Sequence, residues 1–387
     1  MCYKIIKCIY SIIMFSIAIF FSIPIRIIKK RKIWIICEQK HMARDNGLAL
    51  FKYCNKKNNE EKKADVYYII DKKCSDYTYI KNHENIIAYA SFKHYLYYLI
   101  SDVLIMAFPD SICPSAFLEK VLRITKIVNN KKVYLKHGII KDDISSLHSN
   151  KFKTDLIVTA SEKENQYIKE YYGHPSNVVQ LLGLSRYDYL SDESKKNEKK
   201  EILIMPTWRR WINKDIKNTR YYKTYNDLIE TINNKFKEDD DIIFLFYLHN
   251  NFQKFSSAFK NSDKVKILEA NKYKVNELIN RCNIMITDYS SVAFDFAYLN
   301  KPIIYFQFDY EEVVKRHYKA GYFSYKNDGF GPVEENIINV INDIREIQKN
   351  NYENTDFYSK RSNSFFKYRD KNNCERTYNY IVNNLMG

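Results

Sequence analysis

Glycine-rich phosphate loops are missing from this 387-residue chain, which has only eight glycines and seven prolines. Neither G-x-G-x-x-G nor a P-loop sequence occurs, so dinucleotide-dependent oxidoreductases and P-loop NTPases are disfavoured. Zinc-finger spacings, RNP-like aromatic motifs and sustained basic helices outside the N-terminal flank are missing as well. These features usually mark nucleic-acid binding, and we therefore expect no nucleic-acid partner.

The cysteines also lack the spacing of a metal or redox motif. No two of them form C-x-x-C, which indicates neither a zinc site nor a disulfide framework and favours a reducing compartment. Each is expected to be a small buried apolar residue. The eight are Cys2, Cys8, Cys37, Cys54, Cys74, Cys113, Cys282 and Cys374.

Positive charge, in contrast, is in excess. The net charge of +16 and the isoelectric point near 9.2 favour an anionic partner, which is a nucleic acid, an anionic membrane surface or a phosphate-bearing substrate. Charge alone does not choose between these partners. The length suits two domains of ordinary size, and the sequence sets no oligomeric state.

The N-terminus carries a long apolar stretch. Residues 8–25 are uncharged and rich in Ile and Phe, long enough to cross a bilayer core or to lie in one leaflet. More basic residues follow this stretch than precede it, which places the downstream side in the cytosol. A cleaved signal peptide is the alternative, but no small-residue cleavage site precedes the basic cluster. We expect residues 1–32 to anchor the chain at the cytoplasmic face of the cell membrane.

Short apolar runs alternate with polar, helix-compatible segments along the rest of the chain. This alternation predicts an α/β fold with two Rossmann-like lobes, joined by a charged linker at 191–200. The expected domains are an N-terminal lobe at 33–190, a C-terminal lobe at 201–350 and a helical tail at 351–387. Expected strands are 33–37, 66–70, 85–90, 102–107, 133–135 and 156–159 in the first lobe, and 202–205, 242–248, 265–268, 284–287 and 303–308 in the second.

The segment 284–302 joins a predicted buried strand to a helix that ends before a proline. Ser290 or Ser291 is a good N-cap, and the free N–H groups of the first helical turn, at the positive end of the helix dipole, can bind a phosphate. The alternative is that Asp288, Ser290 and Ser291 only cap a helix at the edge of an ordinary sheet. The residues leave both interpretations open.

This segment resembles a family signature. The CDP-glycerol glycerophosphotransferases, which include teichoic-acid-type polymerases and primases, carry T-D-Y-S-S-x-x-F-D-F, and residues 287–296 read TDYSSVAFDF. The resemblance continues in the family's order over roughly residues 33–335. Its further motifs are Lys136-His137-Gly138, Gly183-Leu184-Ser185-Arg186-Tyr187-Asp188, Pro206-Thr207-Trp208-Arg209, Leu248-His249, Lys301-Pro302 and Gly331-Pro332.

His137 follows an apolar run and is expected at the carboxyl end of a strand, where open α/β sheets bind ligands; Gly138 lets a substrate approach the backbone. The resemblance makes His137 the general base that deprotonates an acceptor hydroxyl, with a packed strand-end histidine as the alternative. Many members read H-G-T-P-x-K. This chain reads HGIIK, so the phosphate contact that the resemblance implies for Lys141 comes one position earlier.

His249 ends an apolar run of the second lobe, the position equivalent to that of His137. Histidines from opposite lobes would let one activate the nucleophile while the other stabilises charge on the diphosphate. The family usually has a basic residue two positions before this histidine and a proline after it. Tyr247 and Asn250 stand there in this chain, so a cationic contact at Tyr247 is not carried over. A surface histidine is the alternative for His249.

Polar residues also follow the first predicted strand of the second lobe. Pro206, Thr207 and Arg209 come directly after residues 202–205. The hydroxyl of Thr207 and the two-pronged guanidinium of Arg209 can bind phosphate.

Three further charged residues keep two interpretations each. Arg186 and Asp188 either contact the ligand or form a salt bridge between the lobes. Asp295 lies about one helical turn after Ser291, so its carboxylate either faces the pocket or is solvated on the helix surface.

The acidic run 238–241 precedes a predicted strand, on the wrong side of a parallel sheet, and is expected to be a solvated turn. We therefore expect no metal, and no cofactor is implied.

The resemblance as a whole implies a GT-B type fold and transfer of glycerol phosphate from CDP-glycerol to an acceptor hydroxyl, with release of CMP. The product would be a teichoic-acid-like or capsular cell-surface polymer, and the acceptor a lipid-linked or polymeric polyol phosphate. Three alternatives stay open. They are a CDP-ribitol donor, because no motif measures the length of the polyol, a UDP-sugar glycosyltransferase, and a non-catalytic membrane protein that binds anionic polymer.

Overall fold

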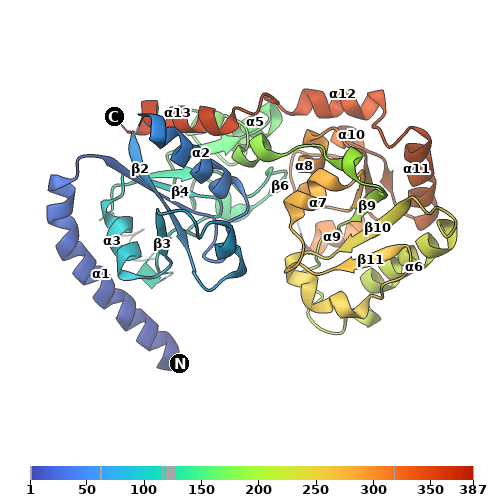
Figure 1. The fold of residues 1–387 in the computed structure, drawn as a ribbon, viewed down its shortest axis with the longest axis horizontal. Helices are drawn as coiled ribbons and strands as arrows, with labels where there is room; N and C mark the ends of the chain where they lie inside the picture. The colour runs from blue at the N-terminus through green and yellow to red at the C-terminus, as the bar shows by residue number, and fades with distance from the viewer. Residues whose placement is uncertain (1, 62, 116, 119–127, 318, 387) are drawn as a thin grey trace. The chain divides into compact units, whose positions relative to one another are not determined.

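The computed structural model describes residues 2–61, 63–115, 117–118, 128–317 and 319–386. The chain forms two compact units, each built on a parallel sheet (Figure 1). The first unit contains Met1–His137, Ser146–Tyr189 and Lys367–Gly387, and the second contains Gly138–Ser145 and Leu190–Phe366. The C-terminal residues therefore return to the first unit, while the eight residues that follow His137 belong to the second.

The sheet of the first unit has seven strands in the order β3-β2-β1-β4-β5-β7-β8, and every pair is parallel. Trp34 of β1 is fully buried and pairs with Val66 on one side and Val103 on the other. Such burial on both faces explains why the strands read as continuous apolar runs. The strands are β1 (Lys32–Cys37), β2 (Ala64–Ile70), β3 (Ile86–Ala88), β4 (Val103–Met106), β5 (Lys131–Tyr134), β7 (Leu156–Thr159) and β8 (Val179–Leu181).

Helices complete the core of the first unit. The C-terminal helix α13 packs on this core, with the ring of Tyr378 5.5 Å from that of Trp34. Ser161 caps α5 by accepting a hydrogen bond from the backbone N–H of Glu164. The helices are α2 (Asn46–Glu61), η1 (Ser75–Tyr79), α3 (Phe92–Ile100), η2 (Ser145–Leu147), α5 (Glu162–Glu170), η3 (Ser185–Tyr189) and α13 (Asn373–Leu385).

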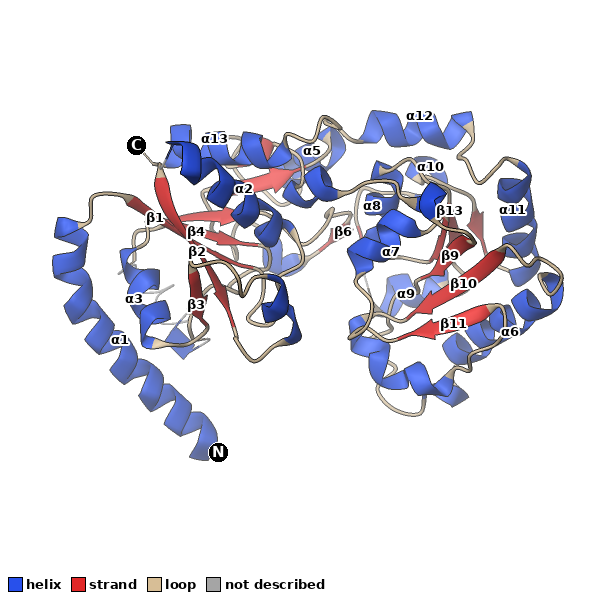
Figure 2. Ribbon diagram, in the orientation of Figure 1, coloured by secondary structure: helices blue, strands red, loops and turns tan. Residues whose placement is uncertain are grey.

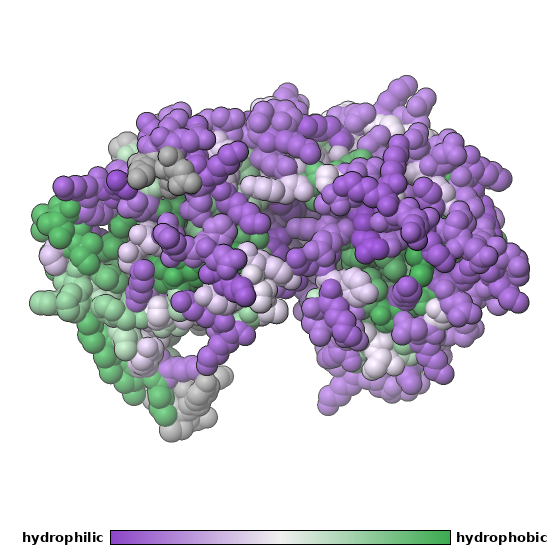
Figure 3. All heavy atoms as spheres, viewed as in Figure 1, coloured by the Kyte–Doolittle hydropathy of each residue, from purple (hydrophilic) through white to green (hydrophobic). Residues whose placement is uncertain are grey.

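The apolar N-terminal stretch is one helix, α1 (Cys2–Ile28). Residues Ile6–Ile28 have a mean hydropathy of 2.3 and are long and apolar enough to cross a membrane. Most of this stretch is exposed, unlike a helix in a protein core. Its apolar side chains form a continuous exposed strip (Figure 3). Lys29 follows α1 and donates to the carbonyl of Ile100, 2.8 Å away, at the C-terminus of α3. The helix fits the membrane association predicted from the sequence.

The second unit contains a six-stranded parallel sheet in the order β11-β10-β9-β12-β13-β15 (Figure 2). All eleven predicted strands of the two units are present, with ends within two residues of those expected. The short edge strands β8 and β15 were not predicted. The strands of this sheet are β9 (Lys200–Ile204), β10 (Ile242–Tyr247), β11 (Val265–Leu268), β12 (Ile284–Thr287), β13 (Ile303–Phe306) and β15 (Val333–Glu334).

Helices also cover the sheet of the second unit. Helix α6 buries Tyr221, Tyr225, Leu228 and Ile232, the spacing of one apolar face. A separate two-stranded ladder joins β6 (Asp142–Asp143) to β14 (Lys319–Ala320) in antiparallel register. The helices are η4 (Ser194–Lys196), η5 (Ile216–Asn218), α6 (Arg220–Lys235), η6 (Asn250–Ala258), α7 (Val275–Arg281), α8 (Val292–Tyr298), α9 (Tyr310–Arg316), α10 (Tyr325–Asp328), α11 (Ile337–Lys349) and α12 (Asp356–Phe365).

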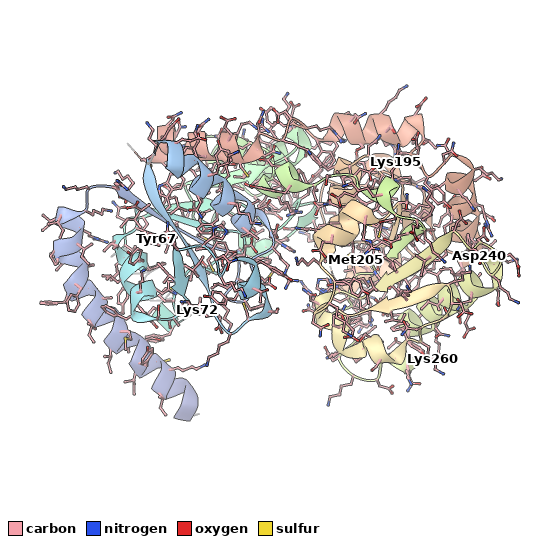
Figure 4. The ribbon with its side chains drawn as sticks, in the orientation of Figure 1. Tyr67, Lys72, Lys195, Met205, Asp240 and Lys260 are labelled. Carbon is pink, nitrogen blue, oxygen red and sulfur yellow. The ribbon has the colours of Figure 1, made fainter. Side chains whose placement is uncertain are left out.

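The acidic run 238–241 lies before β10, at the end of the sheet opposite to Met205 (Figure 4). Asp240 is fully exposed, as expected for a solvated turn. The expectation of a solvated turn is wrong for Asp239, because its carboxylate accepts hydrogen bonds from Arg345 at 2.7 and 2.9 Å. Part of the run therefore ties the turn to α11.

Asp188 has a role that the sequence did not suggest. Its carboxylate accepts hydrogen bonds from the backbone N–H groups of Asn373 at 2.9 Å and Cys374 at 2.7 Å. These are the first residues of α13, so Asp188 caps that helix from a distant part of the chain. The backbone of Gly183 passes close by with φ +82°, and a Cβ there would lie 1.8 Å from Oδ1 of Asn373. Glycine is required at this position by conformation and by space.

Replacing Asp188 with alanine should loosen α13 from the first unit. We expect the free energy of unfolding to fall by about 0.5–2 kcal/mol, the usual cost of losing an N-cap. Urea unfolding followed by circular dichroism measures the change. Asp370→Ala is the matched control, because Asp370 lies at the surface and pairs with Arg376, and it should change the value by less than about 0.5 kcal/mol. Equal effects of the two substitutions would contradict the capping role.

Candidate functional site

His137 lies just beyond the carboxyl end of β5, and the residue before it, Lys136, is held firmly by its neighbours. Lys136 has a left-handed conformation, with φ +65°, which a non-glycine residue adopts only when its surroundings hold it there. Its fully buried ammonium forms an ion pair with Glu164. Its carbonyl accepts a hydrogen bond from Nδ2 of Asn46 at 2.8 Å. The chain therefore presents His137 at a fixed place, with its side chain 54% exposed.

The imidazole of His137 is oriented by a carboxylate that the sequence motifs did not single out. Nδ1 of His137 hydrogen-bonds to Oδ2 of Asp45, and the ring stacks on Phe108 with 4.6 Å between centroids. A carboxylate only accepts, so Nδ1 carries the proton and Nε2 is left as the basic nitrogen. This is the arrangement of a general base supported by an acid residue.

Asp45 stays charged because Arg186 and the N–H group of His137 lie against it. Burial acts to raise the pKa of its carboxyl, but Arg186 and His137 outweigh burial and lower that pKa to about 2. Nη1 of Arg186 lies 2.7 Å from Oδ1 of Asp45 and also donates to the carbonyl of His137. The salt bridge between Arg186 and Asp45 is thus made inside the first unit, and the expected ligand contact of Arg186 stays a prediction.

A second buried carboxylate holds the loop that carries Asp45. Glu38 accepts hydrogen bonds from the backbone N–H groups of Arg44 at 2.9 Å, Asp45 at 2.8 Å and Leu48 at 2.8 Å. Burial, followed by the charge of Asp45, raises the pKa of Glu38 to about 7. The loop packs tightly on this carboxylate, since a Cβ on Gly47 would lie 2.8 Å from Cγ of Glu38.

In the second unit, Arg209 is fully buried at the carboxyl ends of the strands. Its Nε and Nη2 donate to both oxygens of Asp309, at 2.8 and 3.0 Å, and Nη2 also donates to Asp288 at 2.8 Å. Although burial acts to lower the pKa of Arg209, the two carboxylates raise it above its usual range. The guanidinium therefore holds strand ends together, and the phosphate contact expected of it stays a prediction.

Asp288 is also turned inward rather than capping a helix. Its Oδ1 accepts from the backbone N–H groups of Thr207 at 2.8 Å and Tyr289 at 2.6 Å. Pro206 is buried directly after β9, and Thr207 is 5% exposed. The hydroxyl oxygen of Thr207 has no hydrogen-bond partner among the described residues, which is uncommon for a buried hydroxyl.

The two serines lie at the start of α8, which is seven residues long. Oγ of Ser290 accepts from the backbone N–H of Val292 at 3.3 Å, whereas Ser291 makes no capping hydrogen bond through its side chain. Both are partly exposed. Asp295, on the same helix, is 3% exposed, which rules out a solvated position on the helix surface.

His249 follows β10 and is partly exposed. Its Nδ1 accepts from the backbone N–H of Asn251 at 3.2 Å, and its ring stacks on that of Trp208 with centroids 6.1 Å apart. The ring of His317 lies edge-on to that of Trp208, with 5.0 Å between the two centroids. Burial and the charges of Arg210 and Arg209 lower the pKa of His317 to about 3, so it is neutral. No motif pointed to His317.

Lys141 and the partly exposed Gly138 belong to the second unit by their contacts, although they follow His137 directly in sequence. The Lys141 side chain is 5% exposed, pairs with Asp142 and lies over the ring of Tyr325, 5.3 Å from its centroid. It lines a cavity of about 460 Å³. The structure thus gathers His137 and Arg186 in the first unit, and Pro206, Thr207, Arg209 and Asp288 in the second.

Comparison with known proteins adds relatives to this geometry. GgaB, the minor teichoic acid biosynthesis protein of Bacillus subtilis (strain 168), is 35% identical over 373 residues, which is 92% of this chain and 40% of that protein. The teichoic acid poly(ribitol-phosphate) polymerase of Bacillus spizizenii is 28% identical over 248 residues, 58% of this chain and 37% of that protein. The chain thus spans well under two thirds of the length of these relatives.

The fold has solved counterparts. The wall teichoic acid polymerase TagF matches with a TM-score of 0.68 at 16% identity, over 99% of this chain and 96% of that one. This likeness confirms the predicted α/β fold with two Rossmann-like units of GT-B type. The model of the CDP-Glycerol:Poly(glycerophosphate) glycerophosphotransferase family matches residues 18–383. Its motifs, its fold and this match over nearly the whole chain agree, and the chain belongs to that family.

Proposed function

We propose that this protein transfers glycerol phosphate from CDP-glycerol to an acceptor hydroxyl and releases CMP, in the synthesis of a teichoic-acid-like or capsular polymer. The observation that carries the proposal is the oriented, exposed imidazole of His137, supported by Asp45 and Arg186, in a chain of this family. The acceptor is a lipid-linked or polymeric polyol phosphate. Helix α1 holds the enzyme at the cytoplasmic face of the membrane where such an acceptor is found.

In the transfer step, the acceptor oxygen attacks the phosphorus that bears glycerol. The new P–O bond forms as the bond to the bridging oxygen breaks, and CMP leaves with the electron pair. Nε2 of His137 takes the proton of the hydroxyl, because Nδ1 is committed to Asp45. The charged Asp45 then stabilises the imidazolium, and Arg186 keeps Asp45 charged and in place.

The second unit stabilises the charge that develops on the leaving CMP. His249 would donate to a phosphate oxygen, and the hydroxyl of Thr207 with the backbone N–H groups at Ser290 and Ser291 would take the others. Arg209 and Asp288 act in this proposal as positioning residues, because their charged groups are directed at each other. Asp295, Pro206 and Gly138 would contact the same substrate.

Chain connectivity keeps His137 near Lys141. His137 and Lys141 are four residues apart, so their Cα atoms lie within about 14 Å of each other in any conformation. Lys141 is buried beside the cavity of the second unit. Lys141 would bind a phosphate of the substrate.

CDP-ribitol is the second candidate donor. The family is named after CDP-glycerol, yet one relative is a poly(ribitol-phosphate) polymerase. The deciding experiment incubates the purified full chain with CDP-glycerol, CDP-ribitol or a UDP-sugar and a lipid-linked acceptor, and follows release of CMP or UDP. We expect CMP from CDP-glycerol. Release of UDP alone would replace the proposal with a glycosyltransferase.

Substituting His137 with alanine should abolish turnover without unfolding the protein. Loss of a general base lowers kcat by about 10²–10⁴-fold, while the affinity for CDP-glycerol should stay within about threefold because the donor is held by the second unit. Stopped-assay kinetics and donor titration measure the two effects. His83→Ala is the control histidine, because His83 lies beside the start of β2 with Ala64 and Asp65, and this variant should keep full activity. Full activity of H137A would contradict the role of His137. Binding of anionic polymer without turnover in both wild type and H137A would indicate a non-catalytic binding protein.

Asp45→Asn tests the orienting carboxylate. Asparagine can present its N–H₂ to Nδ1 and so favour the wrong tautomer of His137, and we expect kcat to fall by about 10²-fold or more with little change in KM.

The same variant has a pH signature in stability. Because the pKa of Asp45 is about 2 instead of 3.8, its ion pairs stabilise the fold fully above pH 3.8 and are lost as pH falls toward 2. The free energy of unfolding of wild type should therefore exceed that of D45N by on the order of 2 kcal/mol more above pH 3.8 than near pH 2. Parallel pH–stability curves for the two proteins would show that Asp45 is not held charged by Arg186 and His137.

A further inference from the structure

The cavity of the second unit lies beyond the carboxyl ends of two neighbouring strands. Tyr289 follows β12 and Gln307 follows β13, and both side chains form its wall. Ligands of open α/β sheets bind at this edge, and the volume of about 460 Å³ falls within the usual range for small-molecule sites. The remaining wall comes from Tyr310, Val313 and Val314 of α9, from residues 320–326, from Val333 and Glu335, and from Lys141 with Asp142.

Charges of both signs line this cavity. Lys141 and Lys326 supply two ammonium groups, and Asp142 and Glu335 supply two carboxylates. A site for a bare diphosphate would need a surplus of positive charge. A balanced lining suits a ligand that carries one anionic group together with several hydroxyls, since ammonium groups donate to phosphate and carboxylates accept from hydroxyls. A polyol phosphate has this chemistry.

Aromatic rings give the cavity a rigid apolar wall. The ring of Tyr325 lies edge-on to those of Tyr289, at 6.0 Å, and Phe323, at 5.4 Å. Such faces pack against the C–H groups of a polyol chain. The hydroxyl of Tyr289 donates to Asp309 at 3.2 Å, and its ring lies over the guanidinium of Arg209 at 5.1 Å. The cavity wall is therefore fixed to the buried ion pairs at the strand ends.

We propose that this cavity holds a polyol phosphate unit, and that its lining sets which polyol phosphate the protein accepts. The proposal rests on the proposed function and adds the site that recognises the transferred or the receiving unit. Lys141 binds the phosphate, Asp142 and Glu335 accept from the hydroxyls, and Tyr325 packs on the carbon chain. The unit comes either from the donor or from the end of the acceptor, which present the same chemistry.

Direct binding to the full-length protein tests the proposal. CMP, CDP-glycerol, sn-glycerol 3-phosphate and ribitol 5-phosphate are titrated into wild type and Lys141→Met, with ligand-observed NMR for weak binders. Lys272→Met, an exposed lysine away from the cavity, is the control. We expect Lys141→Met to weaken the polyol phosphates about tenfold or more, the loss typical of one charge-assisted hydrogen bond, and to leave CMP unchanged.

The two sources separate in the same data. If CDP-glycerol weakens together with glycerol 3-phosphate, the cavity holds the unit of the donor. If CDP-glycerol binding is unchanged while the KM for the acceptor rises, the cavity holds the acceptor end. Unchanged binding of every ligand, an equal loss of CMP, or no binding of polyol phosphates by wild type would overturn the proposal.

A second variant guards against misfolding of the first. Val314 lines the cavity but is 38% exposed, so Val314→Phe should fold and narrow the space. We expect ribitol 5-phosphate to lose affinity several-fold more than glycerol 3-phosphate; an unchanged ratio would exclude a role for the lining in choosing the polyol. These binding data stand apart from turnover: a protein that binds polyol phosphate here but releases no CMP would refute the proposed function and not the cavity.

Discussion

A single buried guanidinium holds together the sheet edge on which the second unit builds its site. Arg209 follows β9, and its carboxylate partners Asp288 and Asp309 follow β12 and β13, so three adjacent strand ends meet at one charge. Removing one member of a buried ion pair costs about 3–5 kcal/mol in proteins, because the other charge is left in a dry interior. The positions of Thr207, Tyr289 and the cavity wall all follow from this constraint.

The first unit also has a buried charge at its candidate site, but that charge is negative. There a buried carboxylate, Asp45, is kept charged by Arg186 and orients the exposed imidazole of His137. In the second unit the residue next to the buried cation, Trp208, carries the ring on which His249 stacks. The imidazole of His137 is thus set by an interior charge, and the ring that stacks on His249 belongs to the residue next to one. This arrangement gives precise placement to side chains that must stay accessible to a ligand.

Local signals explain what the sequence predicted well. Apolar runs revealed the strands, and polar residues directly after them marked the strand ends that carry His137, Thr207 and His249. The partners of these residues have no local signal. Asp45 lies 92 residues before His137, and Asp309 lies 100 residues after Arg209, so only the fold brings them together. The resemblance to the family could locate the motif residues, but it did not reveal that Asp288 and Arg209 are directed at each other.

The return of α13 to the first unit has a consequence for synthesis of the chain. Tyr378 and the backbone capped by Asp188 complete the core around Trp34, yet they are translated after the main segment of the second unit. All of the second unit is translated before them, so it can fold while the first unit still lacks part of its interior. The setting of His137, which lies in the first unit, would then be completed only after the second unit has been made.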